Sequence, residues 1–416
     1  MPRQPHSHRH AGRIALAAAA AALSTALASA QPAAPAKVGY PIGQILPDGE
    51  LVYGPTLFQW DTRAYVASAG GYLARYRETV DGEELDGAGI VQRVAEDYSV
   101  GPRLLLALIE MHGGWVRDPD PVERVFPVGE PLPGLHAGLS AAADAINARY
   151  YAYRFGGQRS AATADGGAVD MPGTNAASFA VMAYLGRDAA AGTWPGLAAP
   201  TRFYAAWNTL FGDPLRFAVG SPPLDAPPVV TAELPFAPGE PWYFTAGPYS
   251  PWGAGGPRAA VDFAPPPADG TGCAPSTAWV TAAAAGRVVR SRASGVAVNL
   301  GGDPFEGRGW VHVYAHLAAA DRVPVGARVA AGDRLGHPSC DGGLSTQSRV
   351  AFARKYHGEW VPADDPRAPL VMGGWAALPG PVPGEGSLIR SGAGVRTATP
   401  QKAAAVNAVV AERASP

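Results

Sequence analysis

The sequence has few cysteines, few lysines and little charge of either sign. Its 416 residues include only two cysteines, Cys273 and Cys340, and three lysines, and charged residues make up 16%. The formal charge is −2, and no segment concentrates basic residues. Because nucleic-acid binding needs a concentrated positive surface, this composition argues against a nucleic-acid partner.

Long hydrophobic runs are missing after the first thirty residues, so we expect no transmembrane segment in the mature chain. Those first residues have the pattern of a secretory signal: basic Arg3, Arg9 and Arg13, an apolar stretch over 14–28, and the small-residue site Ala28-Ser29-Ala30. The alternative is an uncleaved alanine-rich helix. Cleavage would change the formal charge from −2 to −5 and give a periplasmic or secreted protein.

The two cysteines are expected to pair with each other. In an oxidising compartment the simplest interpretation is one disulfide between Cys273 and Cys340, and the alternative is two separate buried thiols. A zinc site built on them is not expected, because the chain has no CxxC spacing.

Helical periodicity dominates the first half of the chain. Apolar residues follow helical spacing from Leu85 to Tyr98, and Gly101-Pro102 restarts a helix that is apolar on nearly every side as far as Met111. Further helices are expected over 140–153, 175–185 and 194–211. This pattern predicts an all-α domain.

The second half changes to short β-rich runs separated by turns. Seven prolines fall within residues 221–241, which we interpret as a stiff linker. Beyond it the runs predict a mostly antiparallel sheet, with a hairpin-like pair at 323–326 and 329–333. The predicted organisation is a signal peptide (1–30), an N-terminal extension (31–84), a helical domain (85–220), the linker (221–241), a β domain (242–378) and a low-complexity tail (379–416), with at most a frayed helix near 403–413.

Four phrases in order make the β domain recognisable. They are GPRAAVDF at 256–263, VYAHL at 313–317, the glycine-bounded stretch from 325 to 336, and STQSRVAF at 345–352. Together they resemble the lysostaphin/LytM-type zinc endopeptidases, which cut peptide cross-bridges in peptidoglycan. The resemblance implies a LytM-type fold, similar to a duplicated hybrid motif, over residues 242–378.

The resemblance also implies where zinc would bind. In that family the ligands are a His and an Asp four residues apart plus the second His of a His-x-His pair, and two further His residues assist catalysis. Asp262 and the catalytic His316 are present, whereas Arg258, Arg349 and Ala351 stand at the other three positions. Because arginine does not lose its proton and alanine has no donor atom, neither can bind zinc. An arginine there could pair with Asp262 instead.

Other side chains near these positions leave an alternative open. His312 lies four residues before His316, so in a strand both would point to one face, and a relocated zinc site from Asp262, His312 and His316 is conceivable. His337 and His357 are expected in loops flanking the groove. Trp310, Tyr314 and Tyr356 could contact sugars or peptides, or could belong to the sheet core.

A second resemblance concerns the helical half. Residues 98–109 look like the entry to a lysozyme-like lytic transglycosylase domain, whose catalytic Glu would stand at the position of His112. Glu110 lies two positions earlier, on another face of the helix. The alternative is an unrelated helical bundle in which Glu110 is a surface charge.

These patterns together predict an exported cell-wall protein with a degenerate metallopeptidase domain. The expected function is non-catalytic binding of peptidoglycan or regulation of a wall hydrolase, with no cofactor. Two alternatives remain. One is an active zinc endopeptidase with rearranged ligands, and the other is glycan cleavage by the helical domain through Glu110 or His112.

Overall fold

The computed structural model describes residues 37–39, 43–122, 124, 126, 132–197, 199–217, 227–266, 272–343, 345–402 and 404–412. The predicted signal peptide and residues 221–226 of the proline-rich linker fall outside these residues. We refer to residues 43–217 as the helical region and to residues 227–412 as the β region. The chain from Ala36 onward forms one compact unit.

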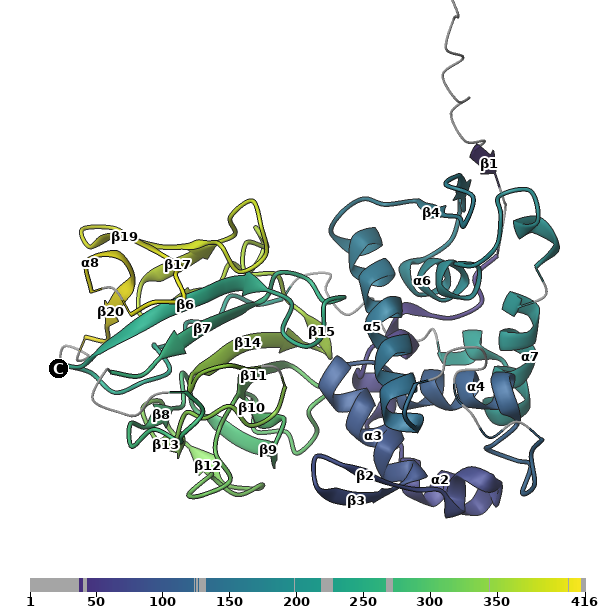
Figure 1. Cartoon of the computed structure of the whole chain (residues 1–416), viewed down its shortest axis with the longest axis horizontal. Helices are drawn as coiled ribbons and strands as arrows, with labels where there is room; N and C mark the ends of the chain where they lie inside the picture. Colours follow the sequence, from purple (N-terminus) through teal and green to yellow (C-terminus); the bar gives the residue numbers. More distant parts are fainter. Residues whose placement is uncertain are drawn as a thin grey trace, which may run out of the picture. The chain divides into compact units, whose positions relative to one another are not determined.

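The helical region is built from seven α-helices among the described residues, labelled in Figure 1 where space allows. They are α1 (Asp48–Leu51), α2 (Thr62–Ala69), α3 (Gly87–Tyr98), α4 (Pro102–Gly113), α5 (Leu135–Arg154), α6 (Ala176–Leu185) and α7 (Ala199–Phe211). Helix α4 begins with Pro102 at its first position and ends at Gly114, which has the left-handed conformation common after a helix. It is buried on nearly all sides, as its apolar sequence predicts.

Two expectations for this half were wrong. The region is not all-α, because β1 (Lys37–Gly39), β5 (Ala168–Asp170) and β4 (Ser160–Ala162) form a small sheet, and β2 (Arg77–Val80) pairs with β3 (Glu83–Asp86). Residues 43–84 are not an extension either, because Leu46, Leu51 and Leu73 are fully buried in the same core as the helices.

The β region is organised around one sheet in the order β12-β9-β10-β11-β14-β7-β6-β20, with β15 added beside β14. Its strands are β6 (Pro241–Tyr249), β7 (Ala260–Ala264), β9 (Gly286–Arg292), β10 (Gly295–Asn299), β11 (Trp310–Ala315), β12 (Arg328–Val329), β14 (Val350–Tyr356), β15 (Glu359–Trp360) and β20 (Ala408–Val410). All pairings in it are antiparallel, which confirms the predicted sheet type.

Smaller sheets correct two further expectations. The expected hairpin-like pair of 323–326 and 329–333 does not form, because 323–326 contains no strand and Val329 belongs to β12, which pairs with β9. The next strand, β13 (Arg334–Gly336), pairs with β8 (Val280–Thr281). The C-terminal segment is ordered into strands. Strands β16 (Val371–Met372), β17 (Trp375–Leu378), β18 (Ser387–Arg390) and β19 (Gly394–Thr397) form a sheet, and a short α8 (Ala404–Asn407) leads into β20 of the main sheet.

The two faces of the main sheet belong to different cores. Side chains alternate along each strand, so Val311 and Val313 share a core with the helices, whereas Tyr314 and its cross-strand neighbour Phe352 lie in a second core inside the β region. Phe236, from the described end of the expected linker, is stacked on Trp242 in that second core. The helical region therefore packs directly against one face of the sheet.

Polar contacts fix the helical region to that face. Arg154 of α5 makes two hydrogen bonds to the buried carboxylate of Glu359, at 2.8 and 3.2 Å. Tyr151 accepts a hydrogen bond from the backbone N–H of Trp360. The carboxylate of Asp144 accepts hydrogen bonds from the backbone N–H groups of Ala254 and Gly255. In Figure 1 strands β14 and β15 end beside α3 and α5.

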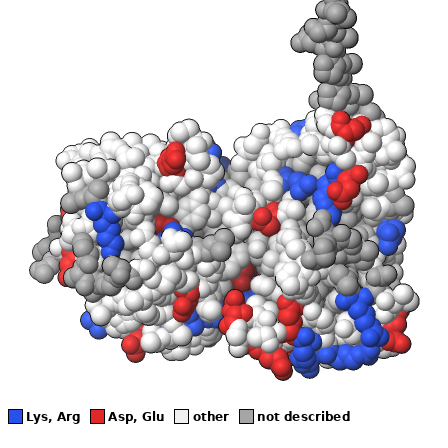
Figure 2. Space-filling view, viewed as in Figure 1, with Lys and Arg blue, Asp and Glu red and all other residues white. Residues whose placement is uncertain are grey.

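A buried ionic network lies in the same contact. Arg290 of β9 pairs with Glu306 at 2.9 Å and with Asp97 of α3 at 3.2 Å, and Lys355 pairs with Glu306 at 2.9 Å. Burial alone would raise the pKa of Glu306, but Arg290 and Lys355 outweigh burial and lower the pKa to about 2. Several of the chain's few charges are thus inside the protein, and Figure 2 shows broad surface areas without charged residues.

Candidate functional site

Asp262 lies at the centre of the candidate site. It is in the middle of β7, between β6 and β14, with Ala351 of β14 directly opposite. Its side chain is 0% exposed. A carboxylate buried this completely needs a compensating positive charge, which a metal ion or a cationic side chain can supply.

Arg349 supplies that charge. Its Nη1 lies 2.9 Å from Oδ2 of Asp262, and the hydroxyl of Tyr249 donates a hydrogen bond to Oδ1. Burial raises the pKa of Asp262 to about 6, against the opposing effects of Arg349 and Tyr249. The carboxylate that the family uses for zinc is therefore held between a guanidinium and a phenol.

Arg258, the other arginine at a ligand position, does not contact Asp262. Its guanidinium donates instead to the backbone carbonyls of Gly380 and Pro381, at 2.5 and 3.2 Å. Of the two arginines expected to be able to pair with Asp262, only Arg349 does so.

His316 remains beside this pair. It follows the last residue of β11 and has a positive φ of 64°. Its Nδ1 lies 3.0 Å from the backbone carbonyl of Asp341. Because a carbonyl can only accept, Nδ1 carries the proton and Nε2 keeps a lone pair. Burial and the nearby Arg349 lower its pKa to about 4, so the ring is neutral at pH 7.

His312 lies on the opposite face, so the expectation that it points with His316 was wrong. It is fully buried in the second core, with its ring edge-on to Phe352 at 5.0 Å between centroids. The alternation that places two histidines four residues apart on one face ends with the strand at Ala315, before His316. Within the described part of the chain, no three His, Cys, Asp or Glu side chains are placed to hold a metal ion.

The other expected groove residues have partners elsewhere. Tyr314 is fully buried, and its hydroxyl accepts a hydrogen bond from the N–H of Ala283. Trp310 packs on Tyr356 and donates its indole N–H to the carbonyl of Pro228. His337 lies against Trp279, and His357 accepts a hydrogen bond from the N–H of Gly309. Tyr314 and Trp310 are core residues.

The sheet face around Ala351 is covered. Trp252, from the segment between β6 and β7, lies over this face together with Asp97 of α3 and Trp360. The cavity that they enclose with Ala315, Ala351 and other side chains has a volume of about 10 Å³. This space holds no more than about one water molecule. A peptide therefore does not fit into this cavity.

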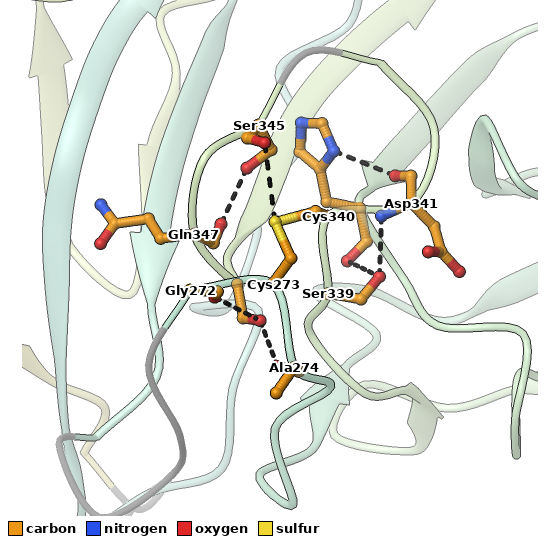
Figure 3. The surroundings of a disulfide bond; sticks show 10 residues. Gly272, Cys273, Ala274, Ser339, Cys340, Asp341, Ser345 and Gln347 are labelled. Atoms are coloured by element: carbon orange, nitrogen blue, oxygen red, sulfur yellow. Dashed lines mark hydrogen bonds between the residues drawn. A yellow bond between two sulfur atoms is a disulfide. The ribbon is translucent and has the colours of Figure 1, made fainter.

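The predicted disulfide between Cys273 and Cys340 is confirmed (Figure 3). It joins the segment before β8 to the segment that contains Asp341 and leads to Arg349. Ser348 reinforces the link, because its N–H and hydroxyl donate to the carbonyls of Gly272 and Ala274. The disulfide thus helps to hold the backbone carbonyl of Asp341, which contacts His316, and Arg349, which pairs with Asp262.

The two candidates in the helical region do not share a cleft with this site. Glu110 accepts a hydrogen bond from the N–H of Val116 at 3.1 Å, and burial raises its pKa. His112, in the last turn of α4, packs edge-on against Phe126, and its pKa is lowered to about 4, mainly by burial. Glu110 therefore stabilises the turn after α4.

Both regions are similar in sequence to known proteins. Residues 44–224 match the family model described as "LasA, N-terminal domain", so the match spans the helical region. Over 344 residues, 77% of this chain and 77% of the relative, the sequence is 29% identical to Protease LasA of Pseudomonas aeruginosa strain UCBPP-PA14 and 28% identical to Protease LasA of strain PAO1. This similarity supports the LytM-type β region and agrees with the predicted periplasmic or secreted location. None of the described helices has the length and apolarity to cross a membrane.

Two solved structures are also similar. One is titled "A Novel M23 Metalloprotease Pseudoalterin from Deep-sea", at 22% identity and a TM-score of 0.33 over 41% of this chain and 96% of that one. The other is the catalytic domain of lysostaphin from Staphylococcus simulans, at 21% identity and a TM-score of 0.21 over 31% of this chain and 89% of that one.

Removing Arg349 should destabilise the protein, because Asp262 would stay buried without its cation. We expect Arg349→Ala to lower the free energy of unfolding by roughly 3 kcal/mol at pH 7. Adding Asp262→Asn to that variant should restore most of the loss, since the buried charge is then gone. Urea titration of the wild type, both single variants and the double variant measures this coupling, and additive effects of the two substitutions would contradict it.

The buried His312 should make the protein sensitive to acid. Its pKa is about 3 in the folded protein, against a usual value near 6.5, because burial and Arg354 disfavour its charged form. The unfolded chain therefore binds a proton first, and stability is lost as pH falls below about 6.5. Between pH 6 and 4.5 we expect the wild type to lose about 2 kcal/mol more than His312→Leu. The free energy of unfolding of both proteins is measured by thermal or urea unfolding at the two pH values. An equal loss for the wild type and His312→Leu would contradict this prediction.

Proposed function

We propose that this protein acts at the bacterial cell wall as a LytM-type protein that has lost zinc-dependent peptidase activity. In this proposal it binds peptidoglycan, or regulates a hydrolase that cuts it, without cleaving the wall itself. The observation that carries the proposal is the ion pair between Arg349 and the fully buried Asp262.

The chemistry of the pair explains why zinc is not expected here. A catalytic zinc needs three protein ligands with free electron pairs and an open position for water. Arg349 offers none and places a positive charge beside the one remaining carboxylate. Ala351, directly across from Asp262, has no donor atom. Asp262 and the Nε2 of His316 leave zinc with two possible ligands.

The covered sheet face supports the same proposal. Trp252 and the helical region leave about 10 Å³ above Ala351, so a peptide does not fit over this cross-strand neighbour of Asp262. Wall binding in this arrangement would use another surface. The alternative of a relocated zinc site would require His312 to leave the second core, where it is fully buried. No contact described for Glu110 or His112 favours glycan cleavage.

Metal analysis tests the loss of zinc. The purified wild type should contain far less than one zinc per chain. The triple variant Arg258→His, Arg349→Ala, Ala351→His should gain about one zinc, because the two new histidines complete the family's set of three ligands with Asp262 and the guanidinium beside Asp262 is removed. Arg328→His, on the exposed edge strand β12, is the matched control and should gain none. Stoichiometric zinc in the wild type that Asp262→Ala abolishes would overturn the proposal.

Co-sedimentation with purified sacculi tests the link to the wall. We expect the mature protein to pellet with intact sacculi and to release no peptide or sugar fragments from them. The Asp262→Asn/Arg349→Ala double variant should pellet equally, since the covered site is not the binding surface. Protein that stays in the supernatant at every sacculus concentration, together with no effect on a wall hydrolase added to the same assay, would refute a role at the wall.

A further inference from the structure

A polar cavity lies where the helical region meets β9, and none of its walls belongs to the site around Asp262. The walls come from the start of α2, from β3, from one side of α3 and from Arg292 of β9. Its volume is about 490 Å³. Sites for small organic ligands usually measure about 300–1,000 Å³, so the cavity is large enough for one.

The arginines on the cavity wall are already paired with carboxylates. Arg93 pairs with Glu83 at 2.5 Å, and both side chains line the cavity. Arg63 forms an ion pair with Asp86, and Arg292 forms ion pairs with two carboxylates of α3. In Figure 2 side chains of both signs gather over the part of the molecule that holds α2, β2 and β3. Because the charges balance, an ionic ligand would have to displace an existing ion pair, whereas a neutral ligand would not.

Hydrogen bonds hold the uncharged polar side chains of the wall in place. The indole N–H of Trp60 donates to the hydroxyl of Thr62 at 3.1 Å, and that hydroxyl donates to Oε1 of Gln92 at 2.8 Å. The amide nitrogen of Gln92 donates to Tyr53 and to Glu96. These bonds fix the side chains before a ligand arrives, which reduces the entropic cost of binding.

The cavity also has an apolar wall. Trp60, Leu85 and Ala88 line it beside the charged groups. Gly89 of α3 lies among the lining residues, and a Cβ added there would lie 3.7 Å from Cδ2 of Leu85 and 3.7 Å from Nη2 of Arg63. The missing side chain of Gly89 thus leaves space between an apolar surface and a hydrogen-bonding one.

We propose that this cavity binds a short stretch of a neutral carbohydrate. Each hydroxyl of a sugar can both donate and accept a hydrogen bond, so it can use guanidinium N–H groups and carboxylate oxygens side by side. The C–H groups of the ring then pack on Trp60 and Leu85. In the free protein these polar groups bind water, which the sugar hydroxyls replace.

The site goes beyond the proposed function, because it does not depend on whether Asp262 binds zinc. Its ligand has two possible sources. The glycan strand of the wall consists of N-acetylated sugars, and other polysaccharides consist of sugars without the acetyl group. The cavity chemistry is the same for both, so the experiment has one arm for each.

Isothermal titration calorimetry of the intact mature protein tests the site. One arm uses chitotetraose, a neutral oligomer of N-acetylglucosamine, and the other uses maltotetraose, a neutral oligomer of glucose. Saturable binding in either arm supports the site, and the arm with the tighter binding identifies the source. Inorganic phosphate at constant ionic strength should not compete with the sugar. Competition by phosphate would contradict the assignment to a neutral ligand.

Two variants locate the binding. Gly89→Leu should weaken it more than tenfold, because the new side chain fills the cavity. Arg63→Gln should weaken it about fivefold, the usual effect of losing one hydrogen bond. Arg63 is 69% exposed, so the second variant tests the site if Gly89→Leu does not fold, which circular dichroism establishes. Ala205→Leu, at an exposed position of α7, is the matched control and should bind as the wild type does.

The outcomes separate this site from the role at the wall. No saturable binding of either oligomer, or equal affinities for the wild type and the folded variants, would overturn the carbohydrate site, even if the protein pellets with sacculi. Saturable binding by a protein that does not pellet with sacculi would leave the carbohydrate site standing and count against the role at the wall.

Discussion

The buried carboxylate of Asp262 sets the main constraint on this protein. It stands in a central strand with no exposure to solvent, so a positive charge must stay beside it. In a zinc peptidase the metal would supply that charge, and here Arg349 supplies it at 2.9 Å. The guanidinium thus balances the buried carboxylate without a metal ion. Asp262 can stay ionised in the interior because Arg349 lies beside it.

The surroundings of the pair follow from the same constraint. The chain segment that carries Arg349 must hold its position, and the Cys273–Cys340 disulfide and the hydrogen bonds of Ser348 fix that segment. Ala351 and Ala315 are small residues on the sheet face beside the pair. Trp252 and the helical region then pack over them. The sheet face around Ala351 is thus covered by packing.

The helical region is joined to the β region by more than the linker. The two share an apolar core, and Asp97, Arg290, Glu306 and Lys355 form a buried ionic network between them. Breaking such a network by removing one partner is costly, because it leaves an unpaired charge inside the protein. The contact therefore favours one arrangement of the two regions.

Residue patterns predicted the sheet type, the buried α4 and the disulfide, since each depends on local periodicity or on a pair of cysteines. The survival of Asp262 and the presence of Arg349 could be seen in the aligned phrases, although their contact could not. Arg258 does not contact Asp262 because its guanidinium donates to the carbonyls of Gly380 and Pro381. These residues lie 122 and 123 positions later in the chain, so no local pattern indicates the contact. His312 was placed on the wrong face because the positive φ of His316 ends the alternation. The glycine- and proline-rich C-terminal strands give too weak a signal to be recognised alone.

The most direct test of the central claim is a crystal structure of the wild-type protein grown with excess zinc, with anomalous data collected at the zinc edge. The account predicts that Arg349 stays in contact with Asp262 and that no zinc peak lies beside that carboxylate. A zinc peak within bonding distance of Asp262 and His316, with the guanidinium of Arg349 displaced, would contradict it.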